Sequence, residues 1–475
     1  MASPITVEIL EICKVSPATD SNESGQRVSL PLTFLDTRLL KFPQAERLYL
    51  YKHINLTPTL FMSTLLPRLK RALSLTLLHF LPLAGHLTWP SDSPEPVILY
   101  DPNDAVSLTV AESNAEFDLL VSNGIREVAE LRPYIPLLSM SDTEVSIISL
   151  RITLFPSKGF SVGIAMHHAA LDGKSGSMFL KAWAYTCKQN QNDGKPSPLL
   201  PELIPSFDRS CIGDPDGLNS YYLNYWLTTT GSNSNSKTKT CSLKLLQNVT
   251  DFEFPPNLVR ATFQLSPDYI SKIRESVQNY YDFQNQPVKL HMSTFVIVSA
   301  YASVCLVKAR GGSGGGGRMV YFLVAVDCRS RLDPPVPENY MGNCVFTVDM
   351  VAEAADFMEE NGVAVIAKRI SDLVKGLEKG VFEGARERHV RLRNAGEQVQ
   401  KIAVVGSPRF CYYEEDFGWG KPEKVEITSV DRINGIQLKD SRDGNGVIEI
   451  GLVLPRHEME AFSLLFDPCL NGLSR

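Results

Sequence analysis

The sequence predicts a mixed α/β fold built around two hydrophobic cores. The chain has 475 residues, more than one compact core usually holds. Segments with helical periodicity and short apolar segments typical of strands occur together in both halves of the chain. Hydrophobic residues make up 44% and charged residues 21%, which excludes a disordered, collagen-like or coiled-coil chain.

In the first half of the chain, the sequence predicts two helices, then two strands and a third helix. Thr57-Pro58 forms a helix start, and Pro67 opens a second helical stretch with leucines at helical spacing. Residues 145–155 and 160–166 are typical of strands joined by a turn. We expect a loop over 167–176 and a helix from about Ser177.

The second half repeats this alternation after a segment without periodicity. Residues 188–240 are rich in Asn, Ser, Pro, Asp and Gly, which predicts a crossover with a mobile loop at 228–236. Ser293 precedes a helix over 294–308, and a glycine run at 311–317 predicts a connector because no Lys-Ser/Thr follows it. The last predicted elements are a strand over 319–326, a tight turn at 443–446, a strand over 447–454 and a helix from Pro455.

Charge and cysteine content narrow the function. The formal net charge is −6 without a basic block, so we expect neither nucleic acid nor an anionic membrane as a partner. The nine cysteines are scattered and form no CxxC pair, so we expect neither a disulfide scaffold nor a metal site. Residues 1–8 lack the pattern of a signal peptide, and no apolar run approaches the roughly 20 residues of a membrane helix. We therefore expect a cytoplasmic protein.

One histidine pair combines proton chemistry with a favourable position. His167 and His168 lie where the predicted strand 160–166 gives way to a loop, a place that displays side chains at an edge. A neutral imidazole can accept a proton near neutral pH and return it later. Asp172, next to Gly173, could fix the loop or orient the ring.

A second string is predicted to be structural. It holds a Phe, a Trp and two Gly, which favour a rigid turn packed as local core over a catalytic site. Its residues are Asp416, Phe417, Gly418, Trp419 and Gly420.

These two strings together resemble the BAHD family of plant acyl-CoA-dependent acyltransferases. Further strings extend the resemblance over nearly the whole chain: Leu30 to Asp36, Leu81 to Leu87, Asp327 to Arg331 and Asn339 to Cys344. The last is similar to the Tyr-Phe-Gly-Asn-Cys string of the subgroup acting on anthocyanins and other flavonoid or phenolic glycosides, with Met341 in place of Phe.

The resemblance implies two chloramphenicol-acetyltransferase-like domains of similar size with a solvent channel between them. We expect an N-terminal acyltransferase domain over 1–195, a crossover loop over 196–240 and a C-terminal acyltransferase domain over 241–475. By the same resemblance, His168 lies midway along the channel, and Asp172 points away from the substrates and pairs with an arginine. Arg329, after a predicted buried strand, is our candidate for that arginine.

The implied chemistry is hydroxyl attack on a thioester, with His168 as general base and no acyl-enzyme. The chain has no Gly-x-Ser-x-Gly string, and Cys344 is interpreted as a packing residue. Acyl-CoA is expected as a co-substrate rather than a bound cofactor. Four residues resemble family segments near its pantetheine and nucleotide: Ser293, Thr294, Ser407 and Arg409.

Malonyl-CoA is the favoured donor, because residues 172–179 resemble the malonyltransferases of the subgroup. Malonate carries a carboxylate, and Lys174 is a candidate to receive it, although the residue also fits a solvated helix start. The predicted function is transfer of the malonyl group to a sugar hydroxyl of a phenolic or flavonoid glucoside by a monomer. Alternatives are a hydroxycinnamoyl-CoA-dependent transferase, a carrier-protein-dependent condensation-type domain and a non-catalytic binding protein.

Overall fold

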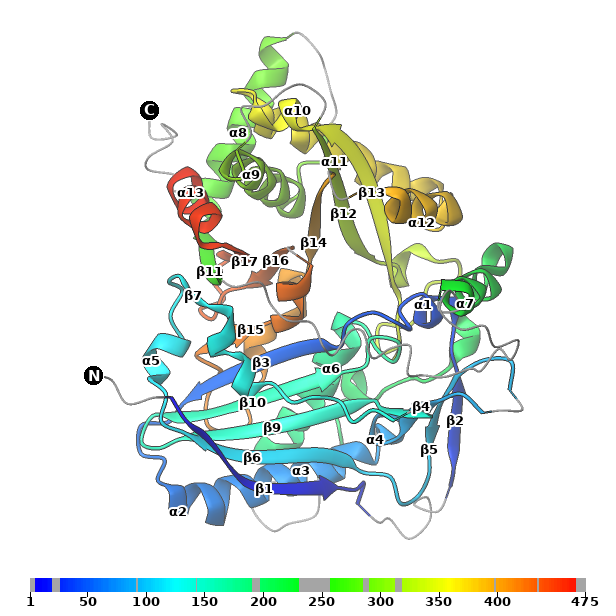
Figure 1. Ribbon diagram of the computed structural model, residues 1–475, viewed down its shortest axis with the longest axis vertical. Helices are drawn as coiled ribbons and strands as arrows, with labels where there is room; N and C mark the ends of the chain where they lie inside the picture. The colour runs from blue at the N-terminus through cyan, green and yellow to red at the C-terminus, as the bar shows by residue number, and fades with distance from the viewer. Residues whose placement is uncertain are drawn as a thin grey trace.

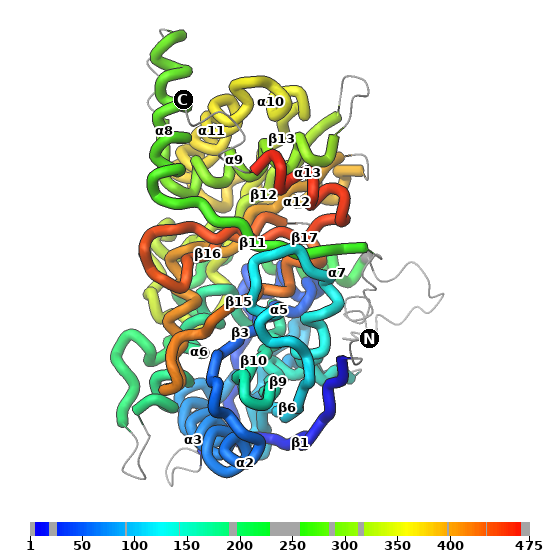
Figure 2. The backbone as a smooth tube through the Cα atoms, turned by 90° about the vertical axis from the view of Figure 1, so that its left-hand side faces the viewer, coloured from blue at the N-terminus to red at the C-terminus, as the bar shows by residue number. Residues whose placement is uncertain are grey.

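The computed structural model places three β-sheets and their covering helices in two halves stacked one on the other (Figures 1 and 2). Residues of the first half form the lower part of Figure 1, and residues of the second half form the upper part. The structure describes residues 5–18, 26–90, 93–141, 143–189, 197–229, 257–284, 290–311, 318–396, 399–433 and 435–466. Most of the predicted loop at 228–236 and of the glycine run at 311–317 lies outside these ranges.

The first sheet carries the strand that leads to His168. Apolar side chains on one of its faces form a core with two helices, and the Trp183 indole donates a hydrogen bond to the Leu69 carbonyl across the pair of helices, with 3.0 Å between nitrogen and oxygen. These helices are α3 (Leu66–Leu77) and α6 (Gly173–Gln189). The strand order is β1 (Val7–Val15), β6 (Val106–Ser113), β9 (Ile148–Phe155), β10 (Gly159–Met166), β3 (Ala45–Lys52) and β15 (Lys424–Glu426).

A small second sheet and several short helices complete the lower half. The sheet is antiparallel, with the order β2 (Val28–Pro31), β5 (Val97–Tyr100), β4 (His86–Thr88) and β8 (Glu144–Ser146). The short helices are α1 (Phe34–Thr37), α2 (Pro58–Leu60), α4 (Leu81–Ala84) and α5 (Phe117–Leu120).

The third sheet forms the core of the upper half. Its order is β13 (Val345–Glu353), β12 (Met319–Asp327), β14 (Gln400–Val405), β16 (Ile436–Asp440), β17 (Ile448–Pro455), β11 (Leu258–Leu265) and β7 (Arg126–Glu127). Its principal helices are α8 (Pro267–Phe283), α9 (Thr294–Ala309), α11 (Gly362–Gly376) and α13 (Arg456–Phe466), which share one apolar core with it. The remaining helices are α7 (Leu218–Thr229), α10 (Ala354–Met358) and α12 (Ala385–Asn394).

Each half contributes a strand to the sheet of the other. β15 comes from the second half and pairs with β3, whereas β7 comes from the first half and pairs with β11 (Figure 1). Arg126 on β7 forms an ion pair with Glu426 on β15, and Glu426 also lies 2.8 Å from the Arg260 guanidinium on β11. All three side chains are buried, so a charged network joins the two halves.

The structure confirms the mixed α/β prediction and corrects four elements. The segment predicted as a crossover loop over 196–240 contains a helix, α7. The predicted strand over 145–155 divides at Ile147 into β8 and β9, which belong to different sheets. α6 begins at Gly173 rather than Ser177, because the Asp172 carboxylate accepts the Ser175 N–H and thereby caps the first turn. The domain boundaries and the solvent channel stay predictions.

The fourth correction concerns the helices before α4. The stretches predicted to start at Thr57 and Pro67 are joined by a π turn over Phe61–Leu65. Pro67 has no N–H to donate to the preceding turn, which accounts for the wider turn at this place. Within the described ranges no helix is long and apolar enough to cross a membrane.

Candidate active site

His168 lies in the six-residue loop between β10 and α6, and its carbonyl accepts a hydrogen bond from Asn343 of the second half of the chain. Every residue of β10 is buried, which fixes the start of the loop. The His168 ring is half-buried, its centre is 6.0 Å from that of Phe42, and the two rings meet edge to face. Nδ1 is shielded from solvent and has no hydrogen-bond partner among the described residues.

His167 is buried and anchors the loop. Its backbone N–H donates to the Ile147 carbonyl at 2.8 Å, and its Nδ1 accepts from the Ala169 N–H at 3.2 Å. Burial and the neighbouring His168 lower the pKa of the buried His167 ring to about 4. The ring is therefore neutral at neutral pH and serves as a hydrogen-bond acceptor.

Asp172 and Arg329 form a buried ion pair at the end of the same loop. Only 4% of Asp172 and 1% of Arg329 is exposed, and Arg329 Nη1 lies 3.0 Å from Asp172 Oδ2. The backbone N–H groups of Ser175 and Cys344 also donate to the Asp172 carboxylate, each at 2.9 Å. Since these partners occupy both oxygens, Asp172 fixes the loop and does not orient the His168 ring.

The ion pair also sets the charge state of Asp172. Burial alone would raise the pKa of its carboxyl, but the Arg329 charge and the hydrogen bonds outweigh burial and hold that pKa below its usual range. The arginine belongs to a 3₁₀ turn, Arg329–Arg331, that follows β12. The pair therefore ties the loop that carries His168 to the segment that follows β12 of the third sheet.

Asn343 and Asp36 hold the backbone of His168 from the other side. The Asn343 amide donates to the His168 carbonyl and to Asp36 Oδ1, each at 2.8 Å. Asp36 is fully buried on α1 and also accepts the Thr33 N–H and hydroxyl. Asn343 and Asp36 belong to strings that carry the family resemblance, but their hydrogen bonds beside His168 were not predicted from the sequence.

The surroundings of His168 favour a neutral ring. Burial lowers the pKa of its imidazole, and the nearby Arg38 charge lowers it further. The carbonyl of His168 itself, the Asp172 carboxylate and Asn343 act in the opposite direction but do not outweigh burial. A neutral imidazole can accept a proton from a substrate hydroxyl.

Lys174 lies in the first turn of α6 and faces carboxylates. Its ammonium group forms an ion pair with Glu338 and lies 3.8 Å from Asp327 Oδ2. The structure thus places a candidate for the donor carboxylate beside two carboxylates of the chain itself. A malonyl group would have to compete with them for Lys174.

The four candidate CoA residues belong to two turns. Ser293 caps α9 by accepting the Val296 N–H, and Thr294 is the first residue of that helix. Ser407 caps the 3₁₀ turn Pro408–Phe410 by accepting the N–H of Arg409. The second turn lies against the start of α6, because the Phe410 ring would be 3.1 Å from a Cβ at Gly173. The structure therefore brings the turn that Ser407 caps to the helix that follows His168, through Phe410.

The Asp416 string is a packed turn far from His168. Asp416 Oδ1 accepts the N–H groups of Gly418 and Gly420 at 2.8 Å, and both glycines have positive φ, at 102° and 98°. Phe417 is buried and contacts Trp183 edge to face. Asp416 also pairs with Lys188 at the end of α6, a 17-residue helix whose start lies roughly 25 Å away.

Cys344 and the metal-ligating side chains of the described residues bear on two other kinds of chemistry, thiol nucleophiles and metal ions. The Cys344 thiol is buried, and burial raises its pKa, which disfavours the reactive thiolate. Among the described residues, no group of three or more His, Cys, Asp or Glu side chains could hold a metal ion.

Comparison with known proteins identifies the family. The family model described as "Transferase family" matches residues 5–467. Phenolic glucoside malonyltransferase 1 of Arabidopsis thaliana is 41% identical, with 98% of each chain covered. Malonyl-CoA:anthocyanidin 5-O-glucoside-6''-O-malonyltransferase of the same plant is 39% identical, with 97% of this chain and 98% of the relative covered.

A solved structure supports the same assignment at the level of the fold. The crystal structure of vinorine synthase superimposes with a TM-score of 0.68 at 21% identity, and 96% of each chain is covered. The resemblance inferred from the sequence is thereby confirmed. The chain belongs to the Transferase family of BAHD acyltransferases, in the subgroup of phenolic and anthocyanin glucoside acyltransferases.

Proposed function

We propose that this protein transfers a malonyl group from malonyl-CoA to a sugar hydroxyl of a phenolic or flavonoid glucoside, with His168 as the general base. The observation that carries the proposal is the placement of the His168 imidazole, whose pKa burial lowers, on a loop fixed at both ends. The activities named for the two relatives from Arabidopsis thaliana support the choice of donor and acceptor.

The reaction needs a base because a sugar hydroxyl is a weak nucleophile. Nε2 of His168 removes the hydroxyl proton while the oxygen forms a bond to the thioester carbonyl. The resulting tetrahedral oxyanion collapses and expels the CoA thiolate. The imidazolium then returns its proton to the leaving sulfur, which gives the malonyl ester and free CoA and restores the neutral base.

The loop contacts explain how the base is held for this step. Asn343 binds the carbonyl of His168, and the pair of Asp172 with Arg329 fixes the loop four residues later. Asn343, Asp172 and Arg329 are positioning residues, because each acts on the backbone of the loop. Fixed geometry lowers the entropy lost when the hydroxyl and the base must meet.

The donor side is proposed around the turns that begin at Ser293 and Ser407. CoA carries phosphates, which helix starts and guanidinium groups bind well, and Arg409 supplies such a group next to Ser407. Lys174 remains the candidate for the malonyl carboxylate. Replacing Lys174 by Met should raise the KM for malonyl-CoA and spare acetyl-CoA, whereas an equal loss with both donors would indicate damage to α6.

A donor and acceptor panel tests the proposed function. The purified protein would be incubated with malonyl-CoA, acetyl-CoA or coumaroyl-CoA at equal concentration and with a set of phenolic glucosides. Released thiol gives the rate, and mass spectrometry identifies the ester. We expect the highest kcat/KM with malonyl-CoA, whereas a preference for coumaroyl-CoA would overturn the choice of donor.

We further propose that the enzyme acts as a cytoplasmic monomer. The chain has a mildly acidic net charge of −6 and no described membrane-spanning helix, which suits a small-molecule enzyme without a nucleic-acid or membrane partner. Light scattering coupled to size-exclusion chromatography would test the monomer, and a fluorescent fusion would test the location.

A further inference from the structure

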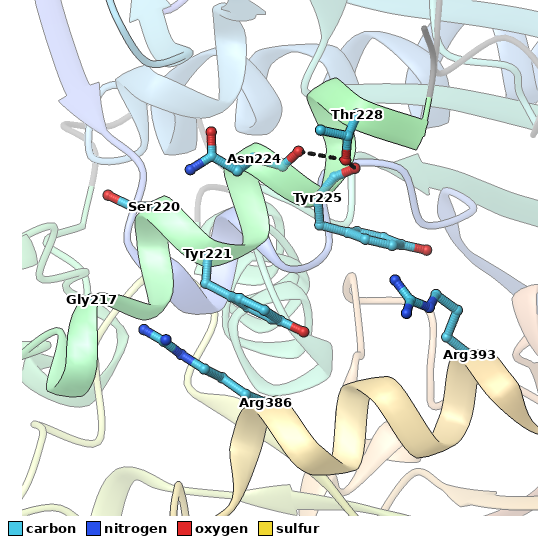
Figure 3. Close-up of a pocket in the computed structure, with 8 residues that line it drawn as sticks. All are labelled: Gly217, Ser220, Tyr221, Asn224, Tyr225, Thr228, Arg386 and Arg393. Carbon is cyan, nitrogen blue, oxygen red and sulfur yellow. Dashed lines mark hydrogen bonds between the residues drawn. The ribbon is translucent and has the colours of Figure 1, made fainter. Parts of the chain in front are cut away.

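A pocket of about 460 Å³ lies between α7 and α12, and the sequence analysis did not assign it (Figure 3). Pockets of roughly 300–1,000 Å³ are the size that binds small molecules. One wall comes from α7 and the residue before it, and the other comes from α12. The lining residues are Gly217, Ser220, Tyr221, Asn224, Tyr225, Thr228, Arg386 and Arg393.

Aromatic rings form one side of this pocket. Tyr221 and Tyr225 project from α7 toward α12 (Figure 3). Both rings meet His389 of α12 edge to face, with ring centres 5.6 and 4.5 Å apart, and the Tyr221 hydroxyl lies 2.9 Å from His389 Nδ1. These contacts hold the tyrosines in place before any ligand binds.

Two guanidinium groups complete the pocket. Arg386 lies over the Tyr221 ring, 5.3 Å from its centre, and also donates to the Asp216 carbonyl. Among the described residues, no carboxylate lies within 4.0 Å of Arg386 or Arg393, whereas Arg391 of the same helix pairs with Asp349 at 3.1 Å. The pocket therefore carries positive charge that the described chain leaves uncompensated.

The pocket is connected to the short helix that supports His168. The Trp226 indole of α7 donates to the Thr37 carbonyl at 2.8 Å, and the Thr37 hydroxyl donates to Asn219 at 2.7 Å. Thr37 follows Asp36, which binds Asn343 beneath the His168 backbone. α7 and His168 are thus fixed to the same helix, α1.

α12 reaches the same region through one aromatic ring. Arg38, which follows α1, lies over the Phe346 ring at 4.9 Å, and Arg388 of α12 lies over that ring at 5.4 Å. The charge of Arg38 also acts on both His168 and His389. Both walls of the pocket therefore adjoin the segment next to the proposed base.

We propose that the pocket between α7 and α12 binds the acidic substituent of an aromatic glucoside acceptor. The tyrosine rings would contact the aglycone, and Arg386 and Arg393 would bind a carboxylate or sulfate on it. This inference rests on the proposed function, since it assigns the acceptor class of the same reaction. The nucleotide of CoA offers similar chemistry, an aromatic base with phosphates, and the experiment separates the two.

The test compares two matched acceptors, 4-glucosyloxybenzoate and its methyl ester, which differ in one negative charge. Their Kd values would be measured by calorimetry without CoA, for the wild type, Arg386→Gln, Arg393→Gln and the double variant. We expect tighter binding of the carboxylate by the wild type and a loss of about fivefold per arginine, the upper end for a solvent-exposed pair. The methyl ester should bind all four proteins equally.

Arg391→Gln is the matched control, because it removes one guanidinium from the same helix but outside the pocket. It should retain the preference for the carboxylate. Equal binding of both acceptors by the wild type, or a preference that survives in the double variant, would overturn the proposal. So would a rise in the KM for malonyl-CoA that matches the loss of acceptor affinity, because the pocket would then hold the nucleotide.

Calorimetry also keeps this inference separate from the proposed function. If the protein binds the carboxylate through Arg386 and Arg393 but transfers no malonyl group, the proposed reaction fails and the pocket assignment stands. If malonyl transfer proceeds with neutral acceptors and the arginine variants change no Kd, the reaction stands and the pocket assignment fails.

Discussion

Removing the charge of Asp172 should destabilise the protein strongly. In Asp172→Asn, the Arg329 guanidinium keeps its charge in a site where 1% of its side chain is exposed. It loses the Asp172 carboxylate 3.0 Å away and retains the more exposed Asp327 carboxylate, 3.1 Å away. Breaking a buried pair on one side costs about 3–5 kcal/mol, and we expect the lower end of that range because Asp327 stays in place. Urea unfolding followed by tryptophan fluorescence measures this loss, because Trp183 is buried on the helix that Asp172 caps.

The pair should also show strong coupling. Asp172→Ala and Arg329→Ala each remove one member of the pair and leave the other charged and buried, whereas the double variant removes both. The loss of unfolding free energy in the double variant should therefore be smaller than the sum of the two single losses by about 1 kcal/mol or more. Asp118→Asn is the control: Asp118 pairs with Lys158 at 3.4 Å on the surface and should cost less than about 1 kcal/mol. Additivity of the Asp172 and Arg329 variants would refute the argument that this pair fixes the loop.

The stabilisation that the Asp172 charge provides should depend on pH. The folded-state pKa of Asp172 lies below the ordinary value, since the Arg329 charge and hydrogen bonds outweigh burial. Its charge therefore stabilises the fold above the unfolded-state pKa of about 3.9, and that stabilisation is lost as the pH falls through the folded-state value. The difference between the wild type and Asp172→Asn should narrow in acid, and a difference that grows in acid would contradict the assignment.

Three further predictions concern the site and the distant turn. Asn343→Ala should lower kcat about tenfold or more, because the amide holds the His168 backbone. It should also shift the acid side of the pH profile and have little effect on the KM for malonyl-CoA. An unchanged kcat in a steady-state assay would remove this role. Asp416→Ala should lower the melting temperature and the soluble yield, because it removes the hydrogen bonds and the ion pair that hold the turn. The kcat per folded molecule should stay close to that of the wild type. A variant with wild-type melting temperature but no turnover would contradict the structural role. The base must be neutral to act, and burial and Arg38 lower the pKa of His168. In a plot of kcat/KM against pH, the apparent pKa on the acid side should therefore lie below the ordinary histidine value of about 6.5. An apparent pKa above that value would show that another group titrates.

Local patterns predicted the elements that carry the site. Alternating apolar residues marked β10, the cap at Ser293 marked the start of α9, and the apolar run after the glycines marked β12. The family strings pointed to His168, Asp172 and Arg329 as one group, and the structure places the last two in contact. Each of these predictions rests on a pattern of neighbouring residues or on a family sequence motif long enough to be specific.

The contacts that sequence reasoning missed are long-range and polar. Asn343 reaches a carbonyl 175 positions away in the chain, and no periodicity encodes that distance. The exchanged strands β7 and β15 are only two and three residues long, too short for a pattern. They are joined by buried charges, Arg126 and Glu426, although such residues ordinarily predict a surface.

The pocket between α7 and α12 was missed for a related reason. Tyr221 and Tyr225 are four positions apart on one helix, which by itself predicts a packed helix face. Only the structure brings them opposite Arg386 and Arg393, which are more than 150 positions further along the chain. Charge without a nearby partner can be recognised only once the neighbours in space are known.

Steady-state turnover of His168→Ala tests the central claim most directly, with malonyl-CoA and a phenolic glucoside as substrates. Since one base carries the proton transfer, we predict that kcat falls by about 10²–10⁴-fold while CoA binding and the melting temperature stay close to those of the wild type. His167→Ala is the neighbouring control and should mainly lower stability, because that ring accepts a backbone hydrogen bond within the loop. A His168→Ala enzyme that turns over within tenfold of the wild type would contradict the account.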